Sequence, residues 1–225
     1  MNNLNQICNI NREDLSRFLI NDGQNEIGEA TQQFCNMVDD INTIEDVGKL
    51  YRLFKHEFKK DENKQYKQFE RLVDEIIKSR IYTGCNDVGL VLSTILRMKG
   101  IPTVFVSSGR IDWIEESQSR PKTNIILGHV FLEIFLSDKW YLFDSIKGLI
   151  YDKYNYNNLS LPRDFYAYRK TLNNWEFGAY TVNDNNKIMR DVFKDFDISE
   201  YKDPEYEVIS LKEYTAKDKG VINEY

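Results

Sequence analysis

The sequence predicts an α+β protein in which N-terminal helices precede an antiparallel β-sheet. Apolar residues recur at helical spacing before residue 100, and short β-branched and aromatic runs follow it. A short polar break separates the last two runs, as in a hairpin. The 225 residues suffice for one large domain, and no linker or repeat divides them. We expect a helical part at 1–80, a core at 80–150 and a C-terminal extension at 151–225 that packs on the core.

The N-terminal part contains two apolar stripes at helical spacing. The first follows Thr43, whose hydroxyl can accept hydrogen bonds from the free amides of a first helical turn. Its members are Val47, Leu50, Tyr51, Phe54 and Phe58. The second stripe comprises Tyr66, Phe69, Leu72, Val73, Ile76 and Ile77. Both predict helices that turn an apolar face to the core, so 11–80 is expected to be mostly helical.

A third stripe predicts a buried helix over 85–98, with Cys85 in its first turn. Its apolar residues are Val88, Val91, Leu92, Ile95, Leu96 and Met98. Gly100 can adopt the left-handed conformation that ends a helix, and Pro102 cannot continue one. Asp87 is expected to be an anion favoured by the helix dipole rather than a catalytic acid.

Three short runs after this helix predict strands at 103–107, 129–136 and 140–144. The segment 109–124 is polar, and we expect a surface loop there. Beyond Tyr151 the chain is richer in Asn and Tyr, with one expected helix around 187–196. This order of helices and strands gives the α+β pattern.

Composition argues against several classes of partner. A net charge of −6 gives no electrostatic reason to expect nucleic acid. The N-terminus lacks the basic start and apolar run of a signal peptide, and no stretch approaches about 18 apolar residues, so no membrane span is expected. The three cysteines, Cys8, Cys35 and Cys85, show no metal-ligand spacing, which favours a reducing cytoplasm over a disulfide framework. Neither a cofactor nor a metal is expected, because the chain has no Gly-rich phosphate loop and no His/Cys cluster.

Cys85 is the candidate nucleophile. A thiol reacts as its thiolate, which a helix N-terminus and a neighbouring imidazolium both favour. The chain has two histidines. His56 lies between Lys55 and Glu57 on a polar helix face and is expected to be an ordinary surface residue. His129 opens an apolar strand, from which an imidazole could face the helix start.

Asp144 ends the next strand, where an unpaired buried carboxylate would be costly. A two-residue turn at 137–138 places Phe131 opposite Asp144. His129 shares the face of Phe131, because side chains alternate along a strand. A four-residue turn also places the side chains of His129 and Asp144 on the same face, whereas a three-residue turn would place them on opposite faces. The predicted register therefore lets Asp144 orient the imidazole of His129 and stabilise its charged form.

Three motifs resemble, in order, those of the transglutaminase-like superfamily. Residues 83–87 (TGCND) and the helix end at 96–102 (LRMKGIP) are similar to its Cys-centred motif. Residues 128–134 (GHVFLEI) resemble its His strand, and residues 140–145 (WYLFDS) its Asp strand. The likeness covers about 80–150. It departs from the superfamily pattern at 130–131, where Ala-Trp is usual, and at Ser145, where Pro is usual.

The resemblance implies a papain-like core, in which a helix carrying Cys85 packs on a sheet carrying His129 and Asp144. It implies that these three residues form a catalytic triad acting on amide or peptide carbonyls of a protein or peptide. An acyl-thioester on Cys85 would be resolved by water, as in a protease or amidase, or by an amine, as in a transglutaminase. Hydrolysis is slightly favoured because water competes in every open site. The backbone N–H of Cys85 is the expected oxyanion donor, and Tyr82 is a candidate for a second.

Two other classes of function remain open from the sequence. One is a catalytically inactive binding module that keeps this fold. The other is a structural α+β protein in which His129 and Asp144 form a buried pair and Cys85 is an inert thiol. Both predict that Cys85 reacts slowly with iodoacetamide at pH 6.

Overall fold

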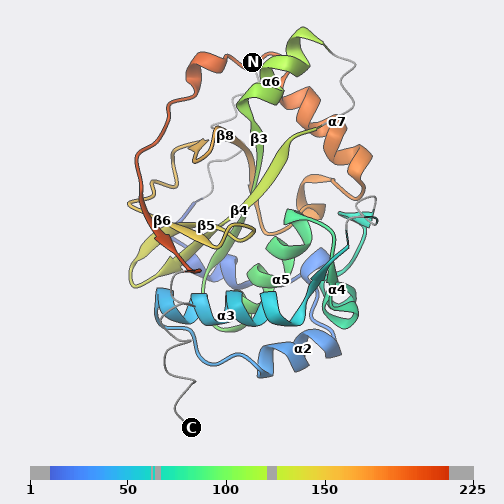
Figure 1. The fold of residues 1–225 in the computed structure, drawn as a ribbon, viewed down its shortest axis with the longest axis vertical. Helices are drawn as coiled ribbons and strands as arrows, with labels where there is room; N and C mark the ends of the chain where they lie inside the picture. The colour runs from blue at the N-terminus through green and yellow to red at the C-terminus, as the bar shows by residue number, and fades with distance from the viewer. Residues whose placement is uncertain (1–10, 62, 64–66, 121–125, 213–225) are drawn as a thin grey trace.

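The computed structural model describes residues 11–61, 63, 67–120 and 126–212, and the fold is α+β, as predicted (Figure 1). The helices are α2 (Glu29–Asn36), α3 (Ile44–Glu57), α4 (Val73–Ser79), α5 (Cys85–Met98), α6 (Ile111–Ser119) and α7 (Val182–Phe193). The strands are β1 (Lys59–Lys60), β2 (Ile81–Tyr82), β3 (Thr103–Arg110), β4 (Gly128–Leu136), β5 (Lys139–Asp144), β6 (Leu149–Asp152), β7 (Ser160–Leu161), β8 (Phe165–Thr171) and β9 (Glu207–Ser210). Short 3-10 turns lie at Leu15–Leu19, Gly23–Asn25, Trp175–Phe177 and Ile198–Glu200.

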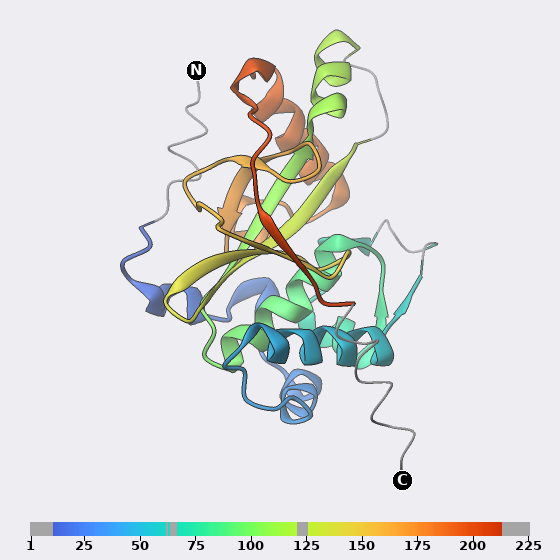
Figure 2. The ribbon, with the colours of Figure 1, turned by 60° about the vertical axis from the view of Figure 1, so that its left-hand side comes forward.

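Seven of the described strands form a large antiparallel sheet in the order β7-β8-β3-β4-β5-β6-β9. The other two, β1 and β2, pair with each other in parallel. Figures 1 and 2 show α2, α3 and α4 gathered with α5 at one end of the molecule, and α6 and α7 at the other. Strands β3 to β6 are neighbours in sequence order, and the later strands add to both ends of the sheet, β8 beside β3 and β9 beside β6. The segment beyond residue 151 therefore extends the same sheet.

The central helix α5 has the predicted bounds, and its C-terminal end has a local physical cause. Gly100 has φ +78°. Its N–H donates to the Arg97 carbonyl (3.0 Å), and the next N–H, of Ile101, donates to the Leu96 carbonyl (2.9 Å). These two bonds form the Schellman arrangement that satisfies the last carbonyls of a helix. A residue with a side chain at position 100 would strain this left-handed turn.

The hairpin between β4 and β5 has the predicted register. Residues 137 and 138 have φ of 51° and 60°, as in a type I′ turn. Leu136 pairs with Lys139, and the ladder runs to Leu132 opposite Phe143. One further step along the same register brings position 131 opposite 144. The side chains of His129 and Asp144 thus share one face of the sheet.

Two hydrophobic clusters cover the two faces of the sheet. The first joins α3, α4 and α5 to the side chains of Val130, Leu132 and Ile134 on β4. α5 lies close against the sheet at Gly89, where a Cβ would come within 2.8 Å of Val130. The second cluster joins the other face, through Phe131, to α6, α7 and the segment around Phe18.

Two predictions for the second half of the sequence were wrong in part. The segment 109–124, expected to be a loop, contains the end of β3 and the helix α6, whose Trp113 and Ile114 are buried. Residues 121–125 lie outside the described part. The helix expected around 187–196 instead spans Val182–Phe193, because Thr181 and Asp184 form a capping box at its start.

The second apolar stripe of the N-terminal part forms a shorter helix than predicted. α4 begins only at Val73, and Phe69 is buried with φ +75°, which ends any helical path through it. Tyr66 lies outside the described residues. As a result, 67–72 is a turn that faces the start of α5, and Gln68 lies within it.

A buried charge cluster lies on the sheet face away from α5. Glu133 on β4 is fully buried, with the Lys170 ammonium of β8 at 2.8 Å and the Tyr154 hydroxyl donating at 2.6 Å. Arg12 also pairs with Glu133, and its guanidinium lies 4.9 Å from the ring centroid of Trp140. Burial alone would raise the pKa of Glu133, but Lys170 and Arg12 hold it below its usual value. The carboxylate is therefore ionised at neutral pH.

Candidate active site

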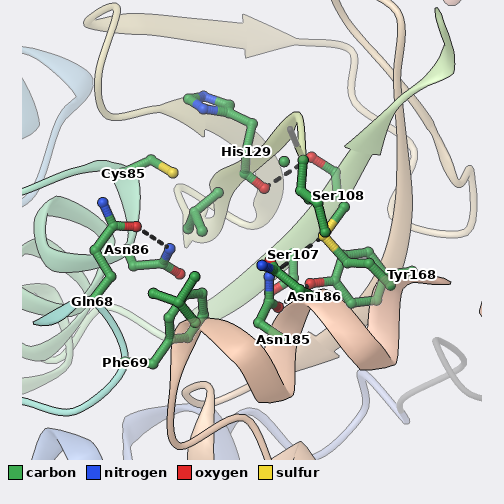
Figure 3. A pocket seen from close by; sticks show the side chains of 15 residues that line it. Gln68, Phe69, Cys85, Asn86, Ser107, Ser108, His129, Tyr168, Asn185 and Asn186 are labelled. Carbon is green, nitrogen blue, oxygen red and sulfur yellow. Dashed lines mark hydrogen bonds between the residues drawn. The ribbon is translucent and has the colours of Figure 1, made fainter. Parts of the chain in front are cut away.

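Cys85 is the first residue of α5, and Asp87 holds the loop before it. The Asp87 carboxylate accepts the N–H and the O–H of Thr83, each at 2.7 Å, and pairs with Arg71. Asp87 is thus placed at the first turn of the helix, where its charge also complements the helix dipole. The Cys85 side chain points toward the imidazole of His129 (Figure 3).

His129 is held between a carboxylate and two aromatic rings. Its Nε2 lies 3.0 Å from Asp144 Oδ1, and its ring contacts those of Phe131 (centroids 4.7 Å apart) and Phe165 (5.2 Å). Burial disfavours the charged ring, but hydrogen bonds to Asp144 and Cys85 outweigh it and raise the pKa of His129 to about 9. The imidazole is therefore an imidazolium at neutral pH, with both nitrogens able to donate.

Asp144 is fully buried and accepts several donors. Besides His129, the backbone N–H groups of Ile146 (3.2 Å) and Lys147 (3.0 Å) donate to Oδ1, and the Arg163 guanidinium pairs with Oδ2. Burial raises the pKa of Asp144, but the hydrogen bond and charge of His129, with Lys147 and Arg163, lower it overall. The carboxylate can therefore stay ionised in the interior.

Arg163 was not expected from the sequence. It lies in the turn between β7 and β8 with φ +64°, and its side chain is partly exposed. Nothing in the local sequence distinguishes this arginine from others in polar turns. Its role depends on β8 bringing the turn beside the end of β5.

Cys85 and His129 lie on the wall of a cavity of about 330 Å³. β3, β4, β8 and α7 form the rest of the wall, with the turn that precedes α4. The polar groups of the lining are amides and hydroxyls, namely Gln68, Asn86, Ser107, Ser108, Tyr168, Asn185 and Asn186. Among the described residues that line it, none is an aspartate, glutamate, lysine or arginine. The cavity therefore offers hydrogen bonds to a neutral group beside the thiol.

The structure places Tyr82 away from this cavity and Gln68 within it. The Tyr82 hydroxyl accepts from Lys55 Nζ (3.2 Å), and its ring packs in the first cluster. Gln68 donates from Nε2 to the Thr83 carbonyl (3.2 Å), and its Oε1 accepts from Asn86 (3.3 Å). One Nε2 proton of Gln68 remains for a ligand. The sequence indicated an upstream side chain but did not single out Gln68.

Gly84 leaves the space that Gln68 occupies. A Cβ on Gly84 would lie 2.3 Å from Gln68 Nε2, although the backbone there is extended and unstrained (φ −175°). The glycine before Cys85 is thus needed for close approach rather than for a left-handed conformation. It allows the amide of Gln68 to lie over the start of α5.

His56 and Cys35 lie away from this cavity. The side chain of His56 is 83% exposed and contacts Glu57, as expected of a surface residue. Cys35 is buried in the first cluster, and burial raises its pKa. Cys8 lies outside the described residues. In the described part of the chain, no three His, Cys, Asp or Glu side chains gather as metal ligands, and no helix is long and apolar enough to cross a membrane.

Comparison with known proteins bears on the fold of this chain. No family model matches the sequence, and no curated protein does. The crystal structure of a candidate cysteine protease from Cytophaga hutchinsonii superimposes on 76% of this chain with a TM-score of 0.53 and 13% sequence identity. The two proteins share a fold. This chain spans about half (51%) of the length of that protein, and at this identity the likeness concerns the fold alone.

Proposed function

We propose that this protein is a transglutaminase-like cysteine enzyme that acts on amide or peptide carbonyls. The observation that carries the proposal is the contact between three side chains, of which Cys85 and His129 line one cavity. Cys85 opens the buried helix α5, its thiol faces His129, and His129 is bonded to the buried Asp144. A thiol, an imidazolium and an orienting carboxylate are the groups that thiol-dependent acyl transfer requires. The shared fold with a candidate cysteine protease agrees with this chemistry.

In the first half of the reaction, His129 holds the proton of the Cys85 thiol, and the Cys85 sulfur attacks the carbonyl carbon as a thiolate, forming an S–C bond as the C=O π bond opens. The negative charge that develops on the carbonyl oxygen is stabilised by the Cys85 backbone N–H and by Gln68 Nε2. The C–N bond then breaks as His129 gives its proton to the departing amine. The enzyme is left with an acyl-thioester and a neutral imidazole.

In the second half, water or an amine attacks the thioester carbonyl, and His129 takes the proton of the attacking group. The S–C bond breaks, and the product leaves as a carboxylic acid or a new amide. Asp144 keeps Nε2 of His129 protonated in both halves, so that Nδ1 exchanges the proton. Hydrolysis is the favoured outcome because no feature of the described residues excludes water from the cavity.

Selective alkylation tests the nucleophile. With Cys8→Ser as the background, iodoacetamide at pH 6 should modify Cys85 much faster than Cys35, which is buried and serves as the internal control. The rapid reaction should disappear in His129→Ala. Equal, slow modification of both cysteines would contradict the proposal and favour an inert thiol or a binding module. Peptide mapping by mass spectrometry identifies the modified residue.

Product analysis separates the two outcomes of the thioester. The protein is incubated with a glutamine-containing peptide and a labelled primary amine, with Cys85→Ser as the control. Incorporation of label would assign a transferase, whereas release of ammonia or cleavage without label would assign a hydrolase. If neither product exceeds that of Cys85→Ser for any peptide, the protein does not act on such substrates.

A further inference from the structure

A β-bulge directs Tyr168 toward the cavity. On β3, Ser107 pairs with Arg169 of β8 while Ser108 pairs with Ala167, so Tyr168 is the extra residue. Such a bulge redirects a side chain and is common beside functional sites. The Tyr168 ring is 2% exposed, and its hydroxyl reaches the side chain of Asn185 on α7.

This contact fixes which way the Asn185 amide faces. The Tyr168 hydroxyl donates to Asn185 Oδ1 at 2.7 Å, and Ser107 also interacts with the Tyr168 hydroxyl. With Oδ1 occupied by a donor, Nδ2 must face the other way. Its acceptor there is the Met189 thioether at 3.4 Å, and sulfur is a weak acceptor.

This weakly paired amide lies in the wall of the cavity that holds Cys85. Asn185 is 8% exposed and lines this cavity, as do Tyr168 and Met189 (Figure 3). A buried amide N–H with only a thioether partner gains from a better acceptor, such as a carbonyl oxygen. A carboxylate is a poorer match, because the described lining carries no arginine or lysine to compensate its desolvation.

We propose that Asn185 is a specificity-determining residue that donates a hydrogen bond to a second, uncharged carbonyl on the acyl part of the substrate. The preferred acyl group therefore carries a neutral amide beyond the scissile carbonyl, rather than a purely apolar chain or a carboxylate. This inference rests on the proposed function, since the acyl group must reach Cys85. It gives the otherwise unassigned α7 a role in substrate choice.

The test measures acylation of the full-length protein by 4-nitrophenyl esters, from the burst of released 4-nitrophenolate. One set of esters carries a primary amide two, three or four methylenes from the scissile carbonyl. The matched sets end in an ethyl group or in a carboxylate. The wild-type protein should prefer the amide set, at its best length, by about tenfold, which is the contribution expected of one hydrogen bond.

Asn185→Leu, which keeps the branched outline and the number of side-chain heavy atoms, should remove this preference, so that the ratio of the amide-ester rate to the ethyl-ester rate falls from about ten to about one. Asn183→Leu is the matched control, because this residue is exposed on the same helix and does not line the cavity. Tyr168→Phe should weaken the preference by releasing the amide to turn. Thermal unfolding of each variant shows that it is folded.

The outcomes distinguish this inference from the function on which it rests. An unchanged amide preference in Asn185→Leu, or an equal loss with all esters, would overturn the role of Asn185 and leave Cys85 chemistry intact. If the wild-type protein shows no burst beyond that of Cys85→Ser with any ester, the proposed function fails, and the inference fails with it.

Discussion

Replacing Asp144 with Asn should lower the pKa of His129 strongly. In the wild-type protein this pKa is about 9, against 6.5 for an ordinary histidine, which corresponds to about 3 kcal/mol in favour of the imidazolium. Asp144 accepts a hydrogen bond at 3.0 Å from the charged ring, and such a bond contributes about 1.5–3 kcal/mol. Its loss should therefore lower the pKa by about one to two pH units. In Asp144→Asn, burial still lowers the pKa of His129, and Cys85 is the remaining neighbour that raises it.

Proton NMR can follow this change directly, because the chain has two histidines and one of them is exposed. The imidazole signals are recorded from pH 5 to 10 in the wild-type protein and in Asp144→Asn. His56→Gln assigns the signals and leaves His129 as the single imidazole. The His56 signal should titrate alike in both proteins, which controls for a general effect of the substitution.

Two results would refute this reasoning. If His129 titrates near 6.5 in the wild-type protein, the carboxylate and the thiol do not outweigh burial. If it titrates near 9 in Asp144→Asn as well, the neighbour that stabilises the imidazolium is not Asp144. In either case the orientation of the imidazole by Asp144 would need another explanation.

Three further predictions concern the loop before Cys85, the buried charge cluster and the response to pH. Gly84→Ala should displace the amide of Gln68. It should lower kcat about tenfold or more, as loss of an oxyanion donor does. Stability in urea should change little, because the displaced group is the end of a flexible side chain. Glu133→Gln should lower the free energy of unfolding by about 3–5 kcal/mol, because it leaves Lys170 buried without a counter-charge. The stabilisation from the raised pKa of His129 is present below pH 6.5 and should be lost as the pH rises through about 9, which urea unfolding at several pH values measures.

Matched controls make these predictions decisive. Gln68→Ala should reproduce the kinetic effect of Gly84→Ala, and a fully active Gln68→Ala would contradict the assigned donor. Glu207→Gln breaks an exposed ion pair with Lys153 and should lower the free energy of unfolding far less than Glu133→Gln does. The alkaline loss of stability should be smaller in His129→Gln, and an identical loss would trace it to another group.

The parts of the fold that were predicted correctly depend on local causes. The end of α5 follows from the freedom of Gly100 to take a left-handed conformation, and the bounds 85–98 matched. The register of the hairpin follows from the length of its turn, which brings His129 and Asp144 to one face. Both features can be recognised from a few neighbouring residues.

The elements that were missed depend on distant contacts. α6 has only a short apolar face, and Trp113 becomes a core residue because Phe193 of α7 packs against it, with ring centroids 6.3 Å apart. The stripe that includes Phe69 has helical spacing, yet the chain turns there with a positive φ. The spacing of apolar residues alone does not predict such a turn.

The side chains that complete the candidate site also escaped sequence analysis. Gln68, Arg163 and Asn185 come from a turn, a hairpin and a late helix, and none lies within a recognisable motif. Each reaches its partner across 15 to 19 positions of the sequence, as when Gln68 bonds to Thr83, Arg163 pairs with Asp144 and Tyr168 donates to Asn185, and no helical or strand periodicity relates such positions. The role of each side chain follows from its hydrogen-bonding partners, which the sequence does not give.

The burial of Arg12 against Glu133 has a consequence for the order in which the protein can fold. The two residues are 121 positions apart, so Arg12 leaves the ribosome long before its partner does. Until β4 is synthesised, the Arg12 guanidinium has no carboxylate to pair with on that side of the sheet. This face of the sheet therefore packs only after the later strands have been synthesised. Long-range pairing of this kind makes folding slow. A nascent chain of this protein should stay sensitive to proteases near residue 12 until β8 has also emerged with Lys170.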